Sequence, residues 1–216
     1  RSTLFPYTTL FRSGDATTAI TDLLALDEHF TERTSLTPET VVELLKLCLT
    51  SAGFRFRDTH YDLTDGLPMG APASPNIANI FMGRLEEKAL HSFNHRPPKL
   101  WLRFVDDVFA IVRKAVVSAL LDHLNSQHES ITFTMEMEKD GKLPFLDVSV
   151  HRQPTGELKT DVYRKPTHTG RYLSFSSNHP ESVKRSVVRS LFDRRKYISL
   201  GDTAIKREEE QLYKEL

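Results

Sequence analysis

Two adjacent aspartates, Asp106 and Asp107, stand between apolar residues in the segment Phe104-Val105-Asp106-Asp107-Val108-Phe109. Carboxylates among apolar side chains are costly to bury unless they are paired, and they supply the hard oxygen ligands that Mg²⁺ prefers. In two-metal sites such ions stabilise the attacking and leaving oxygens of a phosphoryl transfer. Asp also favours exposed turns, so the segment by itself leaves a solvated turn as the alternative.

A second segment, residues 65–79, places glycines and prolines directly before an expected helix. Gly66 and Gly70 allow the backbone to approach a ligand closely, and a helix N-terminus favours a phosphate group. Alone, the segment is a weak signal, because most loops of this composition only lead into a helix.

The elements that must position these residues follow from hydrophobic periodicity. We expect a hairpin over 100–112 with Asp106-Asp107 in its turn, and a second hairpin turn at Asp140-Gly141. The helix that Thr37 caps should be buried on much of its circumference, with Cys48 as a buried small hydrophobe. The order of elements predicts an α+β fold, an antiparallel sheet with helices on one face. The helix that Thr37 caps covers 38–52, and the other expected helices cover 15–30, 74–90, 114–127, 180–199 and 202–216. The other expected strands cover 54–57, 131–138, 145–151 and 158–163.

Composition narrows the class of protein. The 216 residues are 39% hydrophobic and 27% charged with a formal net charge of zero, which excludes a disordered chain. The sequence has no apolar run of about 18 residues, so no transmembrane helix is expected. A single cysteine excludes a disulfide framework and a thiolate zinc site, and it favours a reducing compartment.

The charges are segregated along the chain. Residues 14–65 hold ten acids and four bases, net −6, whereas residues 164–200 hold nine bases and two acids, net +7. The basic end suggests a polyanionic partner, and a solvated basic helix face is the alternative. Over 180–199 we expect Val183, Val187, Val188, Leu191 and Phe192 to face inward, with Lys184, Arg185, Arg189 and Arg195 within about one side.

Taken together, the two segments resemble reverse transcriptases. Phe104–Asp107 is similar to motif C, [YF]-x-D-D, and its aspartate pair begins 27 residues beyond Asn79. Segments 133–138, 143–147 and 162–169, followed by 177–180 and Lys184, resemble the Penelope-like retroelement enzymes. The loop is similar to motif B, G-x-x-[MQ]-G-x-x-x-S-P-x-x-A-N, which it matches at Gly66, Met69, Gly70, Ser74, Pro75, Ala78 and Asn79.

The resemblance implies an α+β right-hand polymerase: a palm with an antiparallel sheet and helices, part of the fingers and the start of a thumb. Fingers and palm would cover 14–165, and a thumb-like basic helical segment would cover 166–216. The implied activity is an RNA-directed DNA polymerase, in which a primer 3′-hydroxyl attacks the α-phosphate of a dNTP with two Mg²⁺ ions. The expected partners are an RNA template, a DNA primer and dNTPs, with no membrane, in an intracellular location for which the nucleus is one option.

The resemblance also implies roles for individual residues. Asp106 and Asp107 would be the catalytic, metal-binding carboxylates. Three groups of residues would contact the nucleotide and the nucleic acids: Gly70, Ser74 and Asn79 around nucleotide and template, Tyr163, Arg164 and Lys165 near the primer terminus, and Lys184, Arg185 and Arg189 on the nucleic-acid backbone.

The sequence departs from the family pattern at its start. Arg1–Ser13 matches the translation of a sequencing-library adapter, so we expect the natural chain to begin near Gly14 and to be truncated. Motif A should supply another metal-binding Asp there, but no Asp precedes Asp15. Leu63 also stands where relatives often have Gln. We therefore expect the chain as given to have little or no polymerase activity, and a catalytically inactive nucleic-acid-binding module is the alternative function.

Overall fold

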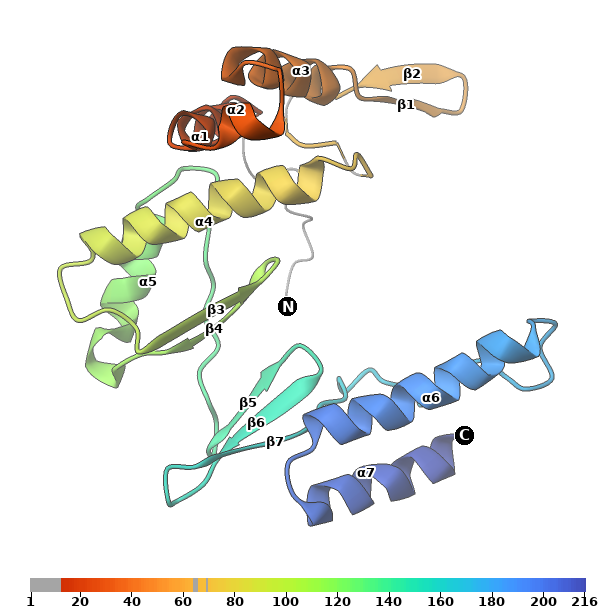
Figure 1. Cartoon of the computed structure of the whole chain (residues 1–216). Helices are drawn as coiled ribbons and strands as arrows, with labels where there is room; N and C mark the ends of the chain where they lie inside the picture. Colours follow the sequence, from red (N-terminus) through yellow and green to blue (C-terminus); the bar gives the residue numbers. More distant parts are fainter. Residues whose placement is uncertain (1–12, 64–65, 69) are drawn as a thin grey trace. The chain divides into compact units, whose positions relative to one another are not determined.

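The computed structural model describes residues 13–63, 66–68 and 70–216 (Figure 1). The chain forms two compact units, one up to Met135 and one from Glu136 to Leu216, and each is described by itself. The segment expected to derive from an adapter lies outside the described residues apart from Ser13, which begins the first helix.

The first unit opens with two helices where the sequence predicts one. The backbone N–H of His29 donates to the side chain of Asp27 and closes a turn, so the prediction of a continuous helix over 15–30 is wrong beyond Ala25. The two helices are α1 (Ser13–Ala25) and α2 (Phe30–Arg33).

Helix α3 (Pro38–Thr50) begins as predicted, because the Thr37 hydroxyl accepts the backbone N–H of Thr40 at 3.3 Å. Its expected burial is wrong. Only two of its residues, Val42 and Leu49, are buried. Leu44, Leu47 and Cys48 are exposed, so Cys48 is not the buried hydrophobe that the apolar run suggested.

Helix α4 (Ser74–Ser92) runs through the core of the first unit. Its buried residues recur at helical spacing, and one end packs against α1 while α5 covers the other (Figure 1). The first cluster includes Ile77, Ala78, Phe81, Met82 and Leu85 of α4 with Ala16 and Ile20 of α1. The second includes Ala89 and Phe93 with Leu120 and Leu124 of α5.

Two hairpins belong to this unit. The first joins β1 (Gly53–Phe56) to β2 (Thr59–Asp62), so the predicted strand near 54–57 is confirmed and its partner strand is new. The second joins β3 (Leu100–Phe104) to β4 (Asp107–Ile111), as predicted. After it, the predicted helix over 114–127 is present as a 3₁₀ turn, η2 (Lys114–Val116), followed by α5 (Val117–Asn125).

The strand predicted over 131–138 is wrong, because these residues form no ladder with the described part of the chain. An asparagine side chain takes the place of a partner strand. Asn125 accepts the backbone N–H of Phe133 at 2.6 Å and donates to the Phe133 carbonyl at 3.1 Å. Ile131 and Phe133 still pack on the core, which explains the alternating pattern at the start of the segment.

The second unit holds one three-stranded antiparallel sheet and two helices. Both backbone φ angles at Asp140 and Gly141 are positive, 52° and 71°, which confirms the predicted turn, although it closes an isolated bridge between Lys139 and Lys142 and joins no pair of strands. The strand predicted over 145–151 is interrupted at Leu146-Asp147, where β5 turns into β6. The elements are β5 (Lys142–Phe145), β6 (Val148–Arg152), β7 (Leu158–Val162), α6 (Glu181–Ile198) and α7 (Asp202–Glu215).

Helix α6 buries no residue completely. Val187, Leu191 and Phe192 are half-buried, as their inward placement requires. Val183 and Val188 are exposed, so the prediction that they face the core is wrong. The helix therefore lies on the surface of its unit, where α7 and β7 cover one side of it.

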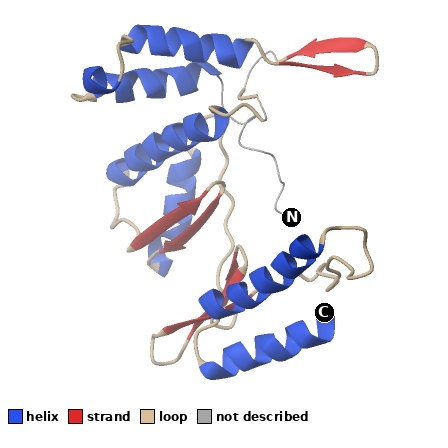
Figure 2. Cartoon of the chain, turned by 45° about the vertical axis from the view of Figure 1, so that its right-hand side comes forward, coloured by secondary structure: helices blue, strands red, loops and turns tan. Residues whose placement is uncertain are grey.

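The fold class is α+β, with every strand pair antiparallel. The expected single sheet is not observed: the strands form separate ladders of two, two and three strands among the described residues (Figure 2). In the part of the chain that the structure describes, the helices fall short of the length and apolar character that crossing a bilayer requires.

Candidate active site

The paired aspartates lie at the tip of the β3–β4 hairpin. Phe104 pairs with Asp107, so Val105 and Asp106 make a two-residue turn and Asp107 begins β4. Both aspartates are exposed. The predicted hairpin is confirmed, but its turn lies one residue earlier than predicted: Asp106 is the second turn residue, and the neighbouring Asp107 is the first residue of β4.

Val105 has a positive φ of 56°. A branched side chain at Cβ makes this backbone region unfavourable. Such strain persists only where the surrounding structure holds the residue, so the turn that carries the aspartates needs support from its neighbours.

The same turn occurs twice more among the residues that the structure describes. Each of these three turns follows a Phe and has the form Phe-X-Asp, with X at a φ of 54° to 56°. Asp58 and Asp147 occupy the turn position of Asp106, so turn chemistry alone accounts for an aspartate there. The β3–β4 hairpin differs from the other two by its second carboxylate, Asp107, since Thr59 and Val148 stand at that position.

One face of this hairpin is apolar and open. Leu102 and Phe104 are 53% and 59% exposed. Cross-strand partners share a face, so Asp107 lies on the same face as Phe104, its partner. The carboxylates therefore stand at the end of an exposed apolar strip.

Arg103 connects the opposite face of the hairpin to α4. Its Nε donates to Glu86 Oε2 at 2.8 Å, and both side chains are nearly buried, at 12% and 10% exposed. Its Nη1 donates to the Val105 carbonyl and its Nη2 to the Asn79 carbonyl, each at 3.4 Å. One guanidinium thus contacts both the helix and the strained turn residue. Sequence reasoning missed Arg103 and Glu86, because nothing in their spacing pairs them.

The loop before α4 closes on itself through Ser74. The Ser74 hydroxyl is buried and donates to the Pro68 carbonyl at 2.7 Å. Ala73 is the N-cap of α4, and Ser74, which a sequence pattern of Ser before Pro would favour as the cap, is instead its first helical residue. Gly70 has a φ of 84° and is exposed, as is Asn79. Met69 of the same motif lies outside the described residues.

Exposed, adjacent carboxylates fit a hard divalent cation, since Mg²⁺ is commonly bound by one or two carboxylates together with substrate phosphates and water. Within the described ranges, no group of three or more His, Cys, Asp or Glu side chains is arranged to hold a metal ion. The donor set that the structure offers at this turn is thus the aspartate pair.

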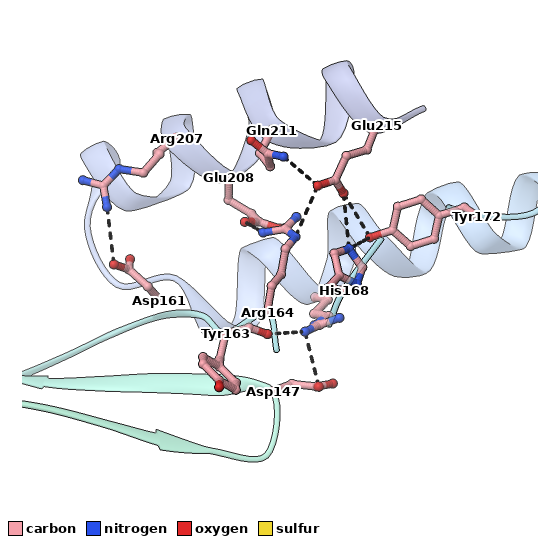
Figure 3. Close-up of polar contacts among 11 residues, drawn as sticks. Asp147, Asp161, Tyr163, Arg164, His168, Tyr172, Arg207, Glu208, Gln211 and Glu215 are labelled. Carbon is pink, nitrogen blue, oxygen red and sulfur yellow. Dashed lines mark hydrogen bonds and ion pairs between the residues drawn. The ribbon is translucent and has the colours of Figure 1, made fainter. Parts of the chain in front are cut away.

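The three residues expected near the primer terminus, Tyr163, Arg164 and Lys165, lie in the second unit. Tyr163 donates its backbone N–H to the Asp147 carbonyl at 2.8 Å, and Lys165 is exposed. Arg164 forms a two-pronged ion pair with Glu208 of α7, at 2.5 and 2.7 Å (Figure 3). The hydrogen bonds to Glu208 raise the pKa of Arg164 above its usual value.

Glu215 of α7 completes this cluster. Burial raises the pKa of Glu215, but hydrogen bonds and positive charges outweigh burial and hold it below the usual 4.5. Burial likewise raises the pKa of Tyr172, which donates to Glu215 at 3.2 Å. The groups that lower the Glu215 pKa are Gln211, Arg164, Tyr172 and His168. An open cavity of about 500 Å³ adjoins the cluster, and Lys165, His168 and Lys214 are among its lining residues.

The bases of α6 differ in exposure. Arg185 and Arg189 are exposed, and Arg185 pairs with Glu181 one turn away at 2.6 Å. Lys184 is half-buried, and its Nζ donates to the Phe175 carbonyl at 2.6 Å. Arg195 is half-buried and pairs with Glu209 of α7 at 2.6 Å. The four bases that were expected on one side therefore divide by exposure. Arg185 and Arg189 are exposed, whereas Lys184 and Arg195 are half-buried and held by partners.

Two family models match the chain. The model described as reverse transcriptase (RNA-dependent DNA polymerase) matches residues 22–173. The model described as animal helix-turn-helix domain matches residues 171–216, which include α6 and α7. Comparison with curated proteins finds no match. The first match covers both the loop before α4 and the β3–β4 hairpin.

Proposed function

Because the chain belongs to the reverse transcriptase family, we propose that it is the RNA-directed DNA polymerase domain of a retroelement of the Penelope-like type. In the proposed reaction, a primer 3′-hydroxyl attacks the α-phosphate of a dNTP that pairs with an RNA template, and pyrophosphate leaves. One observation carries the proposal: two adjacent exposed carboxylates stand at a hairpin turn that Arg103 ties to the helix after the Gly- and Pro-rich loop.

Asp106 and Asp107 would hold Mg²⁺. Two such ions, when bound, would stabilise negative charge on the attacking 3′-oxygen of the primer and on the oxygen that leaves with pyrophosphate. The chain's own contribution is positional: the β3–β4 ladder holds the two carboxylates at neighbouring positions, and the turn keeps them exposed to substrate.

We assign the other residues in polymerase terms. Residues 14–165 would form fingers and palm, and 166–216 a thumb-like segment. Gly70, Ser74 and Asn79 would shape the nucleotide and template site around the start of α4. Two sets of residues would contact the primer and its duplex with the template. The first set is Tyr163, Arg164 and Lys165, and the second is the bases Lys184, Arg185 and Arg189. We also propose an intracellular location, with the nucleus as the candidate compartment, because the substrates are RNA, DNA and dNTPs.

A second candidate function is a catalytically inactive nucleic-acid-binding module. It is favoured by the lack, among the described residues, of a third metal-ligating side chain beside the aspartate pair. The exposed bases of α6 would serve binding in either case.

Primer extension and binding, measured on the same protein, test whether these 216 residues are active by themselves and whether they bind nucleic acid, which both candidates require. The assay uses poly(rA)/oligo(dT) with Mg²⁺ and dTTP, and Asp106→Asn is the control. We expect salt-dependent binding and little or no synthesis from these 216 residues, because no Asp precedes Asp15 to supply the motif A carboxylate. Robust synthesis that Asp106→Asn abolishes would refute this expectation and establish the enzyme within this chain. Lack of binding would contradict both candidates.

A further inference from the structure

Arg103 is placed to act on the turn that carries the aspartates. It belongs to β3, and its three hydrogen bonds run to Glu86, Asn79 and Val105. Two of these acceptors belong to α4 and the third is the carbonyl of the first turn residue. The side chain therefore fixes the tip of the hairpin against the helix.

The hydrogen bond at Val105 bears directly on Asp106. The Val105 carbonyl and the Asp106 N–H belong to one planar peptide unit. A hydrogen bond to that carbonyl restrains the orientation of the plane, and so the direction in which Asp106 leaves the turn. Val105 has a positive φ of 56°, which a branched residue adopts only where its neighbours hold it.

The charge of Arg103 is balanced inside the unit. Glu86 Oε2 accepts from Arg103, and the other oxygen, Oε1, is buried with no hydrogen-bond partner among the described residues. Arg103 is thus the group that compensates the buried carboxylate. An arginine suits the place because its fork presents several donors in fixed directions, whereas a lysine offers one compact charge.

We propose that Arg103 is the positioning residue of the Val105-Asp106 turn and of the aspartate pair at its end, acting through its hydrogen bonds to the Val105 and Asn79 carbonyls while Glu86 holds its guanidinium in place. The proposal deepens the proposed function, since it concerns the same pair of carboxylates. The proposal predicts that a positive charge alone at position 103 does not hold the turn in its orientation.

The test is Arg103→Lys in the full 216-residue chain, with ¹⁵N relaxation measured at the amides of Val105, Asp106 and Asp107. Lysine keeps a cation beside Glu86 but removes the hydrogen bonds to the two carbonyls. We expect wild-type order parameters near 0.85, the value of rigid backbone, and a fall below about 0.6 in the variant. Arg84→Lys is the matched control, because Arg84 also pairs with a carboxylate, Asp22, and donates to a carbonyl, that of Ala19, away from the hairpin.

In the same spectra, the amides of residues 100–102 report on the order of the strand part of the hairpin, in β3. Loss of order in the turn with retained order in the strands supports the proposal. Unchanged turn amides in Arg103→Lys, a wild-type turn that is already below about 0.6, or loss of order in strands and turn together would each overturn it.

Mn²⁺ titration, followed by paramagnetic broadening, separates this inference from the proposed function. Binding that Asp106→Asn abolishes supports the metal site, and Arg103→Lys should then weaken the affinity by a factor of about three to ten, the range of one net hydrogen bond. If the wild type binds no Mn²⁺ at the turn while the order parameters respond as expected, the metal proposal fails and the positioning role stands.

Discussion

Removing two exposed arginines from α6 should weaken nucleic-acid binding in a way that salt reveals. Removal of one phosphate-binding base lowers the magnitude of the slope of log K against log[salt] by about 0.7–0.9. Arg185 and Arg189 are both exposed, and the Arg185–Glu181 pair is itself solvent-exposed, so it competes weakly with a phosphate. We therefore expect Arg185→Gln/Arg189→Gln to lower the slope by about 1.4–1.8.

Lys184 and Arg195 should behave differently although they carry the same charge. The Lys184 ammonium is held by the Phe175 carbonyl, so adding Lys184→Gln to the double change should lower the slope by less than either exposed arginine does. Arg195→Gln is the control, because Arg195 is half-buried and paired with Glu209. Its slope should equal that of the wild type.

The assay is fluorescence anisotropy of a labelled RNA–DNA hybrid between 50 and 200 mM salt, with hybrids of two unrelated sequences. Phosphate contacts carry no sequence information, so the affinity of the double variant should fall equally on both. An unchanged slope in the double variant would show that these bases are only a solvated surface. An equal fall of the slope in Arg195→Gln would show that net charge, rather than exposure, sets the slope.

Three further predictions concern stability and reactivity. Glu86→Gln should lower the free energy of unfolding by about 3 kcal/mol, because it leaves the nearly buried Arg103 without its charged partner. The melting temperature should then fall by roughly 6–12 °C. Replacing both residues by Met should restore most of the lost stability. Glu215 has a pKa below 4.5, so its contribution to stability is present above pH 4.5 and is lost as the pH falls through the lowered pKa. The melting temperature of Glu215→Gln should therefore fall less between about pH 5 and pH 3 than that of the wild type. An equally steep fall would refute the role of Glu215. Cys48 is exposed and should react with a thiol reagent such as DTNB in the native chain, whereas protection until unfolding would contradict its position.

Local backbone chemistry made several elements predictable. Thr37 accepts the N–H of Thr40 where the sequence placed a helix cap, and Asp140-Gly141 turns the chain with two positive φ angles. The hairpin that carries Asp106 and Asp107 also follows from nearby residues. The threefold recurrence of Phe-X-Asp at hairpin turns is a sequence signal that could have located β1–β2 and β5–β6 as well.

Burial could not be predicted in the same way. Hydrophobic periodicity identifies the apolar side of a helix but not the element that covers it. The apolar side of α3 therefore predicted a buried Cys48, which is exposed, and the alternation over 131–138 predicted a strand where Asn125 supplies the hydrogen bonds instead.

The sequence by itself determined the family features of the site: the paired aspartates, the glycines and prolines before α4, and the basic segment that becomes α6. These depend on residue type and short spacing, which one segment of chain can express alone. Only the tertiary structure decided which charges are paired. Arg103 pairs with Glu86, which is 17 residues away in the sequence, and Arg164 pairs with Glu208, which is 44 residues away. Arg195 of α6 pairs with Glu209 of α7. Such pairs form when packing brings distant elements together, because an ion pair needs proximity in space and leaves no periodic trace along the chain.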